Sequence, residues 1–409
     1  MDPVKRLKLA CYGTNSTMSV VGNISPVLFL TFRSLYGISY SLLGLLVLIN
    51  FVTQLIIDLI FSFFSHRFNI PKTVKCIPAI ATFGLFIYAL WPLLFPQTAY
   101  LGITVGIIIA SAAAGLGEVL ISPVIAAIPA DDPDREMSKL HSVYAWGVVV
   151  VIAISTLFLY FAGGENWPWL VFLFLLLPIS ATVLFAGAEI PPMETPERAS
   201  GALHLLKNKA LWLSVTAIFL GGAAECTMAQ WSSGYLERAL DIPKVWGDLC
   251  GVAMFSVMLG LGRTLYANIG KNIGKVLTFG AVGAVLCYFT AAVVNVPVIG
   301  LIACALTGFC TSMLWPGNLV VASAKFPQGG VFIYALMAAG GDLGASVAPQ
   351  LVGIITDAVI ASPAATALAS SMSLAPEQLG MKLGMLVGML FPLAAIPLYR
   401  YIWKSLKAE

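Results

Sequence analysis

The stretch YLGITVGIIIASAAAGLGEVLISPVIAAI, residues 100–128, decides the fold class of this chain. It holds one ionisable residue, Glu118, among glycine, alanine and aliphatic side chains. A helix that crosses a bilayer needs about twenty mostly apolar residues, and this stretch is long enough. It therefore predicts a membrane-spanning helix that carries an acid within the apolar layer.

Eleven further stretches of the same kind occur along the chain. The complete set of predicted spans is 9–32, 40–64, 74–95, 100–128, 141–162, 167–188, 211–236, 246–268, 275–295, 298–322, 329–358 and 380–403. The composition agrees, because 59% of the residues are hydrophobic and only 10% are charged. Soluble domains carry roughly a quarter of charged residues, and a soluble fold of this composition would expose large apolar patches. The sequence predicts an all-α membrane protein with twelve transmembrane helices.

The longest polar stretch lies near the middle of the chain. It predicts a six-helix bundle at 1–190, a cytoplasmic linker at 191–209 and a second six-helix bundle at 210–409. With the N-terminus in the cytoplasm, 18 of the 22 Lys and Arg residues fall on the inner side. The four on the outer side are Arg33, Arg238, Lys244 and Lys382. Because cytoplasmic loops are rich in Lys and Arg, we expect a multi-pass protein of the cell (inner) membrane with both termini cytoplasmic.

Several classes of function are disfavoured by what the sequence contains. A net charge of +3 without a basic stripe does not indicate a nucleic-acid partner. The seven cysteines are scattered without a CxxC pair, so we expect no metal and no cofactor. There is no HExxH, no nucleophile elbow and no signalling domain outside the spans, which argues against an enzyme or a sensor. We expect a monomer whose partners are the lipid bilayer, a small-molecule substrate and protons.

Ionisable residues deep within spans are costly and mark functional sites by default. Helix rise places Glu118 roughly 15 Å and Glu225 roughly 20 Å from the cytoplasmic ends of their helices, near the midplane. Since burial favours the neutral form of a carboxyl group, both acids are predicted to load and release a proton. The alternative is a structural acid that locks two helices together. Nearer the cytoplasmic face, a predicted gate consists of Asp58, Arg67, Arg263 and Asp342.

Polar and aromatic residues accompany the two glutamates in the predicted spans. Amides and carboxylates bind hydroxyl groups, and indoles stack on the apolar faces of sugar rings, whereas the alternative for each aromatic is packing or an interfacial belt. The predicted substrate-binding residues are Asn15, Asn23, Glu118, Tyr144, Glu225, Gln230, Trp231, Trp315 and Asn318. His141 is either a proton-sensitive gate or a loop cap.

Two six-helix halves joined by a cytoplasmic linker resemble the major facilitator architecture. The stretch 62–69, with Arg67, and the pair Gly262-Arg263 resemble the two copies of its loop motif. Four further stretches, in the expected order, resemble the fucose–proton symporter family within those facilitators. They are Leu140-His141 to Gly147, Gly222-Ala-Ala-Glu225 with Trp231 and Tyr235-Leu236, Trp315-Pro316, and Gly340-Gly-Asp-Leu-Gly344 with Pro349, Gly353 and Asp357.

This resemblance implies proton-linked transport of a sugar or a related small polar solute. Glu118 is placed like a fourth-helix glutamate that the family uses in proton coupling and sugar binding. The family's first-helix acid has no counterpart, because Asn23 stands there and cannot titrate. Coupling would then rest on Glu118 and Glu225. We predict a secondary transporter that works by alternating access, with proton-driven efflux of an amphipathic drug or metabolite as the alternative.

Overall fold

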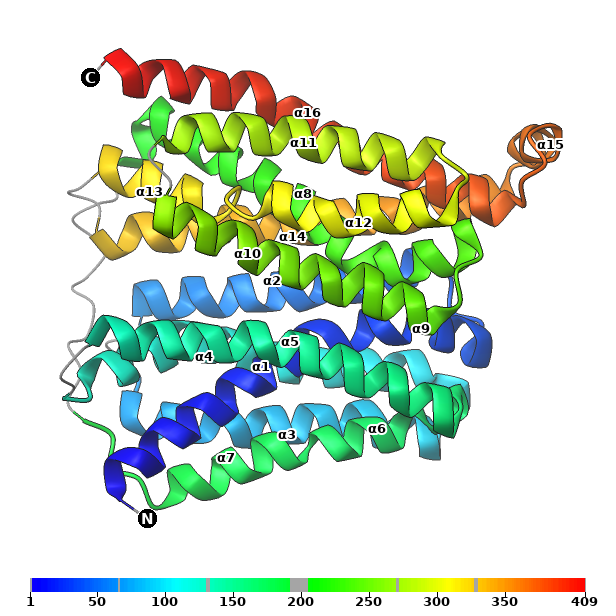
Figure 1. Ribbon diagram of the computed structural model, residues 1–409. Helices are drawn as coiled ribbons and strands as arrows, with labels where there is room; N and C mark the ends of the chain where they lie inside the picture. Colours follow the sequence, from blue (N-terminus) through cyan, green and yellow to red (C-terminus); the bar gives the residue numbers. More distant parts are fainter. Residues whose placement is uncertain are drawn as a thin grey trace. The chain divides into compact units, whose positions relative to one another are not determined.

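The computed structural model describes residues 2–64, 67–129, 133–191, 205–269, 272–326 and 330–408, and these residues form helices without strands. Within these residues, eleven helices are long and apolar enough to cross a membrane, and Trp146–Ala162 is a further apolar helical segment. In a bilayer only structures that satisfy their own backbone hydrogen bonds can span, so helices are the expected solution. Figure 1 shows that the long helices of each unit run side by side within that unit. The predicted all-α membrane fold with twelve spans is confirmed.

Contacts divide the chain into two compact units. The first unit is Met1–Tyr36 with Ile49–Ser200, and the second is Gly37–Leu48 with Gly201–Glu409. The division near residue 200 falls inside the stretch predicted to be the linker. The second unit also includes the first residues of helix α2 (Tyr40–Phe64), which the prediction assigned to the first bundle.

The first unit contains most of the predicted first six spans. Its helices are α1 (Pro3–Tyr36), the later part of α2, α3 (Ile70–Leu94), α4 (Ala99–Ala127), α5 (Pro133–Ala162), α6 (Trp167–Phe174) and α7 (Leu176–Ala186), with 3-10 turns at Pro96–Thr98 and Gly164–Asn166. Helices α3 and α4 touch through glycine, since a Cβ added at Gly84 would lie 2.5 Å from the backbone nitrogen of Ala110. Close backbone approach of this kind is how helices pack in lipid.

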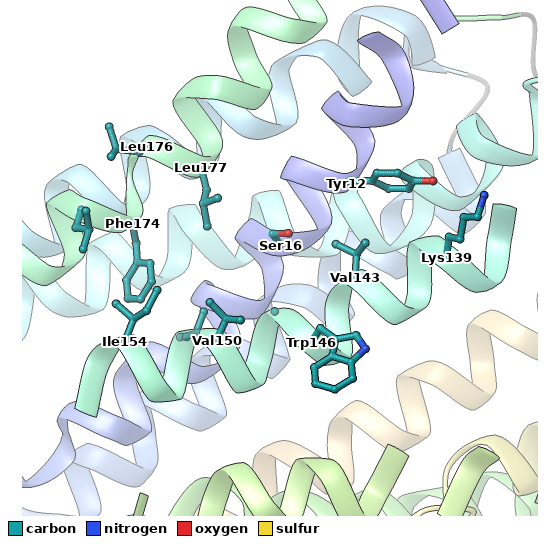
Figure 2. A pocket seen from close by; sticks show the side chains of 13 residues that line it. Tyr12, Ser16, Lys139, Val143, Trp146, Val150, Ile154, Phe174, Leu176 and Leu177 are labelled. Atoms are coloured by element: carbon teal, nitrogen blue, oxygen red, sulfur yellow. The ribbon is translucent and has the colours of Figure 1, made fainter. Parts of the chain in front are cut away.

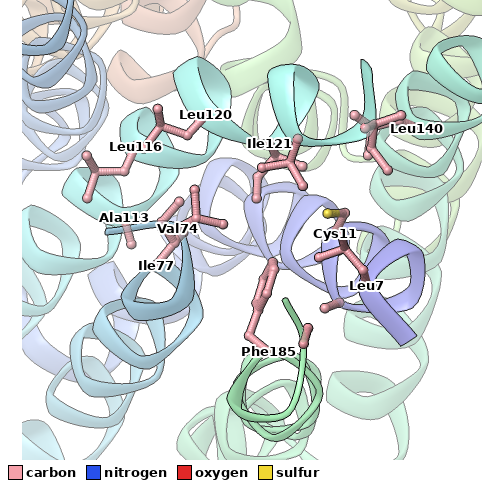
Figure 3. Packing of buried hydrophobic residues seen from close by; sticks show 14 of the residues in the cluster. Leu7, Cys11, Val74, Ile77, Ala113, Leu116, Leu120, Ile121, Leu140 and Phe185 are labelled. Atoms are coloured by element: carbon pink, nitrogen blue, oxygen red, sulfur yellow. The ribbon is translucent and has the colours of Figure 1, made fainter. Parts of the chain in front are cut away.

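A hydrophobic cluster joins the helix ends on the N-terminal side of the first unit. Figure 3 shows Leu7 and Cys11 of α1 facing Phe185 of α7 and Ile121 of α4. All four of these side chains are at most 4% exposed. This cluster fixes α1 against α4 and α7, and thereby sets the height of the polar residues one to three turns further along α1.

The second unit holds the remaining helices. They are α8 (Lys209–Leu240), α9 (Lys244–Trp246), a π-helical segment at Gly247–Ala253, α10 (Met254–Ile269), α11 (Ile273–Val293), α12 (Pro297–Thr311), α13 (Pro316–Lys325), α14 (Gly330–Ala361), α15 (Pro363–Ser371) and α16 (Pro376–Ala408). Helices α8 and α14 approach at Gly344, where an added Cβ would lie 2.0 Å from the carbonyl oxygen of Phe219. Short α15 lies between two spans and was not predicted.

Two predicted continuous spans are interrupted by proline. The span predicted at 167–188 is divided at Leu175, and that at 298–322 is divided at residues 312–315. Proline lacks an N–H, and its ring displaces the carbonyl four residues earlier. Pro178 and Pro316 therefore account for breaks at Phe174–Leu175 and at Ser312.

Candidate functional site

The first unit brings together two acids from different helices. Helices α2 and α4 approach at Gly115, where an added Cβ would lie 3.1 Å from the Cα of Gln54. Asp58 and Glu118 each lie about one turn beyond this crossing, and their carboxyl groups interact electrostatically. Asp58 is 5% exposed, and its Oδ1 has no hydrogen-bond partner among the described residues. Glu118, in contrast, is exposed at the surface of its helix.

Polar residues of α1 line its seam with α5. The Asn15 amide donates to the carbonyl of Leu140 at 2.7 Å, and Ser19 donates to the carbonyl of Tyr144 at 2.9 Å. Half-buried Asn23 donates to the carbonyl of Ser19 at 2.9 Å. The Tyr144 side chain is 39% exposed. The structure therefore groups Asn15, Asn23 and Tyr144 along one seam, with Asn15 engaged in holding α5.

The second unit has a charged cluster around Arg263 of α10. Its Nη2 lies 3.3 Å from Glu225 Oε1 of α8, and its Nε donates to the carbonyl of Ser312 at 3.1 Å. The other Glu225 oxygen, Oε2, is buried without a hydrogen-bond partner in the described part of the chain. Asp342 of α14 is 5% exposed and, like Glu225, acts electrostatically on the side chain of Cys226. Two acids thus share the neighbourhood of one arginine.

Trp315 lies beside this cluster, at the break between α12 and α13. Its ring contacts small residues, since a Cβ at Gly341 would lie 2.6 Å from a ring carbon and one at Gly222 would lie 3.0 Å from another. Gly222 precedes Glu225 by three residues on one face of α8. The predicted residues Glu225, Arg263, Trp315 and Asp342 are therefore close neighbours.

Other predicted substrate-binding residues are engaged in packing within the second unit. The Trp231 indole is 1% exposed and donates to the carbonyl of Pro349 at 2.8 Å. Asn318 is 2% exposed and donates to the carbonyl of Leu314 at 2.6 Å and to the hydroxyl of Tyr399 at 3.1 Å. Gln230 is 8% exposed. The structure gives Trp231 and Asn318 helix-locking contacts, and their role toward a substrate stays a prediction.

The predicted gate residues are distributed over both units. Arg67 is exposed, with its guanidinium 5.4 Å from the centre of the Phe64 ring. Arg263 pairs with Glu225, and Asp58 interacts with Glu118, as described above. The gate stays a prediction. His66 and the side chain of His141 lie outside the described residues.

A polar cluster that the sequence did not single out binds the start of α2 to α14 and α16. The Asp357 carboxylate accepts hydrogen bonds from the backbone N–H groups of Tyr40 at 3.1 Å and Ser41 at 2.6 Å. The Tyr40 hydroxyl donates to Glu377. An acid near the outer end of one span was visible in the sequence, but its pairing with the start of α2 requires the fold.

Two further polar groups inside the spans were also missed. Asn50 is 7% exposed and its Oδ1 accepts a hydrogen bond from Ser111 at 2.6 Å. This bond joins α2 to α4 about two turns before Asp58 and Glu118. Lys382 of α16 is 5% exposed and donates to the carbonyls of Ala292 and Val294, at 3.3 and 3.4 Å. An amide or an amine within an apolar run was the available signal.

Comparison with known proteins gives one family. The sequence profile described as "Major Facilitator Superfamily" matches residues 10–349. No curated protein sequence matches the chain significantly. A bacterial homologue of the human lysosomal transporter Spinster is similar in structure, with TM-score 0.73, 12% identity and coverage of 98% of this chain and 96% of that one.

Two further solved structures share the fold. The nucleoside transporter NupG has TM-score 0.71 and 13% identity, and the match covers 97% of this chain and 100% of that one. A D-xylose–proton symporter has TM-score 0.68 and 15% identity, with 97% and 98% covered. At these identities the likeness concerns the fold, whereas the profile match extends over most of the sequence. The chain belongs to the major facilitator superfamily, and it is a multi-pass membrane transporter of small solutes that works by alternating access, not an enzyme.

Proposed function

We propose that this transporter moves a small hydroxyl-bearing solute, a sugar or sugar derivative, and couples its movement to protons through Asp58 and Glu118. The observation that carries the proposal is the α2–α4 crossing at Gly115, which brings these two carboxyl groups into one neighbourhood within their spans. Two neighbouring carboxylates are not both ionised when like charges repel and one of them, here Asp58, is also desolvated by burial. The pair therefore retains a proton.

The proton held by this pair has a route to water. Glu118 is exposed, and an ionisable side chain exposed within a membrane span faces a water-filled cavity rather than lipid. Asp58 is buried behind it. Glu118 then exchanges the proton, and Asp58 tunes the exchange. This arrangement supplies a coupling site although Asn23 replaces the acid that fucose–proton symporters carry in their first helix.

The cluster in the second unit supplies the groups for the solute. Arg263 neutralises one Glu225 oxygen, and the partnerless Oε2 is able to accept a hydrogen bond from a hydroxyl group. The adjacent Trp315 ring offers an apolar face of the kind that stacks on sugars. The sugar class is supported by this pairing of a carboxylate with an indole, and by the resemblance to fucose–proton symporters.

Purified protein in proteoliposomes tests both parts of the proposal. A thermal-shift screen of monosaccharides, nucleosides and hydrophobic cations selects the solute, and its uptake is then measured with and without an inward proton gradient. Wild type is expected to accumulate a monosaccharide only with the gradient. Glu118→Gln should lose gradient-driven accumulation but retain solute counterflow, because counterflow requires binding and alternation without net proton movement.

The matched control is Glu165→Gln, which neutralises an exposed carboxyl in the turn before α6. It should accumulate solute as wild type does. Accumulation that ignores the gradient, or that survives Glu118→Gln, would refute the coupling site. Stabilisation by hydrophobic cations alone, with gradient-driven extrusion, would replace uptake by the efflux alternative.

A further inference from the structure

The first unit has a cavity of about 890 Å³ between α5 and the α6–α7 pair, over α1. This volume is within the range of about 300–1,000 Å³ that small-molecule sites occupy. Figure 2 shows Val150 and Ile154 of α5 facing Phe174 and Leu177, with Tyr12 and Lys139 at the other end.

The cavity exists because α5 and α7 each pack tightly on α1 while remaining apart from each other. A Cβ at Gly147 of α5 would lie 2.6 Å from Ser19 Oγ, and a Cβ at Gly13 of α1 would lie 3.2 Å from the Cβ of Ala181 in α7. The break at Leu175, caused by Pro178, bends the α6–α7 pair at the deep end of the cavity. Helix α1 thus forms the floor of the groove, and the tight packing of α5 and α7 on α1 fixes the width of the groove.

The groove is polar at one end only. Lys139 is exposed at that end, with Tyr12 beside it, and apart from Ser16 near the middle the rest of the lining is almost entirely apolar. From Val143 to Ile154 the apolar wall of α5 extends over twelve residues, or about 16 Å. Half of a hydrocarbon core is about 15 Å thick, so the groove matches one leaflet.

We propose that this groove binds one acyl chain of an anionic phospholipid, whose phosphate lies at Lys139. The apolar wall fits a hydrocarbon chain in length and in chemistry, and the cation at its polar end complements a negative headgroup. The Trp146 side chain is 67% exposed on the same wall and lies along the bound chain, about 10 Å deeper than Lys139. The lipid belongs to the leaflet on the side of the chain's N-terminus, since Tyr12 marks the polar end.

A bound chain would tie together three helices of one unit. It would fill the space between α5 and the bend at Leu175, and it would leave α1 packed as it is. The proposed lipid lies within the first unit. It is separate from the coupling site on α2 and α4, and from the solute-binding groups of Glu225, Arg263 and Trp315 in the second unit.

Native mass spectrometry of the full-length protein, titrated with phosphatidylglycerol or phosphatidylcholine of the same chain length, tests the inference. Wild type should retain phosphatidylglycerol preferentially. Lys139→Gln should reduce that preference about fivefold, which corresponds to the roughly 1 kcal/mol that one lysine contributes near an anionic lipid surface. Val150→Trp, which places an indole in the groove at a residue that is 51% exposed, should remove the retained lipid of either kind.

Two matched variants control for nonspecific effects. Lys275→Gln removes an exposed lysine at the start of α11, and Val183→Trp enlarges a valine of α7 that is 61% exposed and outside the groove. Both should retain lipid as wild type does. Equal lipid preference in Lys139→Gln and wild type would overturn the inference, and so would displacement of the lipid by a hydrophobic cation at an equimolar ratio. Because Lys139 is exposed, its substitution leaves the fold intact and that arm is decisive by itself.

Discussion

Replacing Asp357 by alanine should release the start of α2 from the second unit. The first four N–H groups of a helix have no partner within it. In α2, Asp357 accepts those of Tyr40 and Ser41, and the hydroxyl of Ser39 accepts that of Leu42. Alanine at 357 therefore leaves two of these donors without their acceptor.

The expected cost follows from the chemistry of the lost contacts. Losing a helix cap costs about 0.5–2 kcal/mol, and each hydrogen bond to a charged group contributes roughly 1.5–3 kcal/mol. Asp357 is half-buried, and its Oδ1 and Oδ2 each accept one hydrogen bond. Because water partly replaces the lost acceptors in the variant, we expect losing both hydrogen bonds to cost about 2 kcal/mol of stability. Asparagine keeps one acceptor oxygen, and Asp357→Asn should cost about half as much.

Hydrogen–deuterium exchange of peptides covering residues 37–48 measures this loss of stability at the start of α2. A loss of about 2 kcal/mol in the opening free energy speeds exchange roughly thirtyfold, and half of it speeds exchange roughly fivefold. Peptides from α11 should be unaffected. Glu377→Gln, which alters the partner of the Tyr40 hydroxyl and leaves Asp357 in place, should leave these amides nearly as protected as in wild type. Unchanged exchange at 40–43 in Asp357→Ala would refute the capping argument.

Three further substitutions have definite expected outcomes. Gly344→Val should reduce the yield of folded protein in size-exclusion chromatography, because even a Cβ would lie 2.0 Å from the carbonyl oxygen of Phe219, whereas Gly260→Ala, with nothing within 4 Å, should leave the yield unchanged. Arg263→Gln should lower the melting temperature and abolish solute uptake. The double variant Arg263→Gln/Glu225→Gln should be destabilised by less than the sum of the two single changes, because it no longer carries an unpaired buried carboxylate. Additive losses in this double-mutant cycle would contradict the ion pair. Tyr399→Phe should cost about 1 kcal/mol in thermal unfolding, because among the described residues its hydroxyl bonds the carbonyl of Ala217 and the amide of Asn318. The half-saturation concentration for solute should be unchanged. A changed half-saturation concentration would instead favour a solute-binding role for Asn318.

The spans were predictable because hydrophobic length alone specifies them. The stretch 100–128 corresponds closely to α4 (Ala99–Ala127), and the others agree to within a few residues at most ends. The interruptions were not predicted, although Pro178 and Pro316 carried the signal, since proline in a membrane helix is tolerated whenever a neighbour satisfies the freed groups. Whether such a proline bends or divides a helix depends on that neighbour.

The site residues were predictable as types but not as partners. Glu118 and Glu225 stand out as isolated acids in apolar runs. That Glu118 meets Asp58 depends on a crossing at Gly115, and many glycines in α4 could equally have made that contact. Trp231 of α8 is buried and donates to the carbonyl of Pro349, a packing contact that its place in the sequence did not indicate, and its predicted role toward a substrate stays a prediction. Composition does not show which face of such a helix meets its neighbours.

The break between α12 and α13 has a consequence for how the protein is made. The carbonyl of Ser312 loses its helical partner there and accepts a hydrogen bond from Arg263 of α10. A ribosome delivers α10 to the membrane before α12, so the arginine is already in place when the interrupted helix is inserted. Arg263 is itself inserted after Glu225 of α8, so the carboxylate that pairs with it is already in the membrane. The order of these three residues along the chain lets each costly polar group find its partner at the moment of insertion, and variants of Arg263 are expected to impair biogenesis as well as transport.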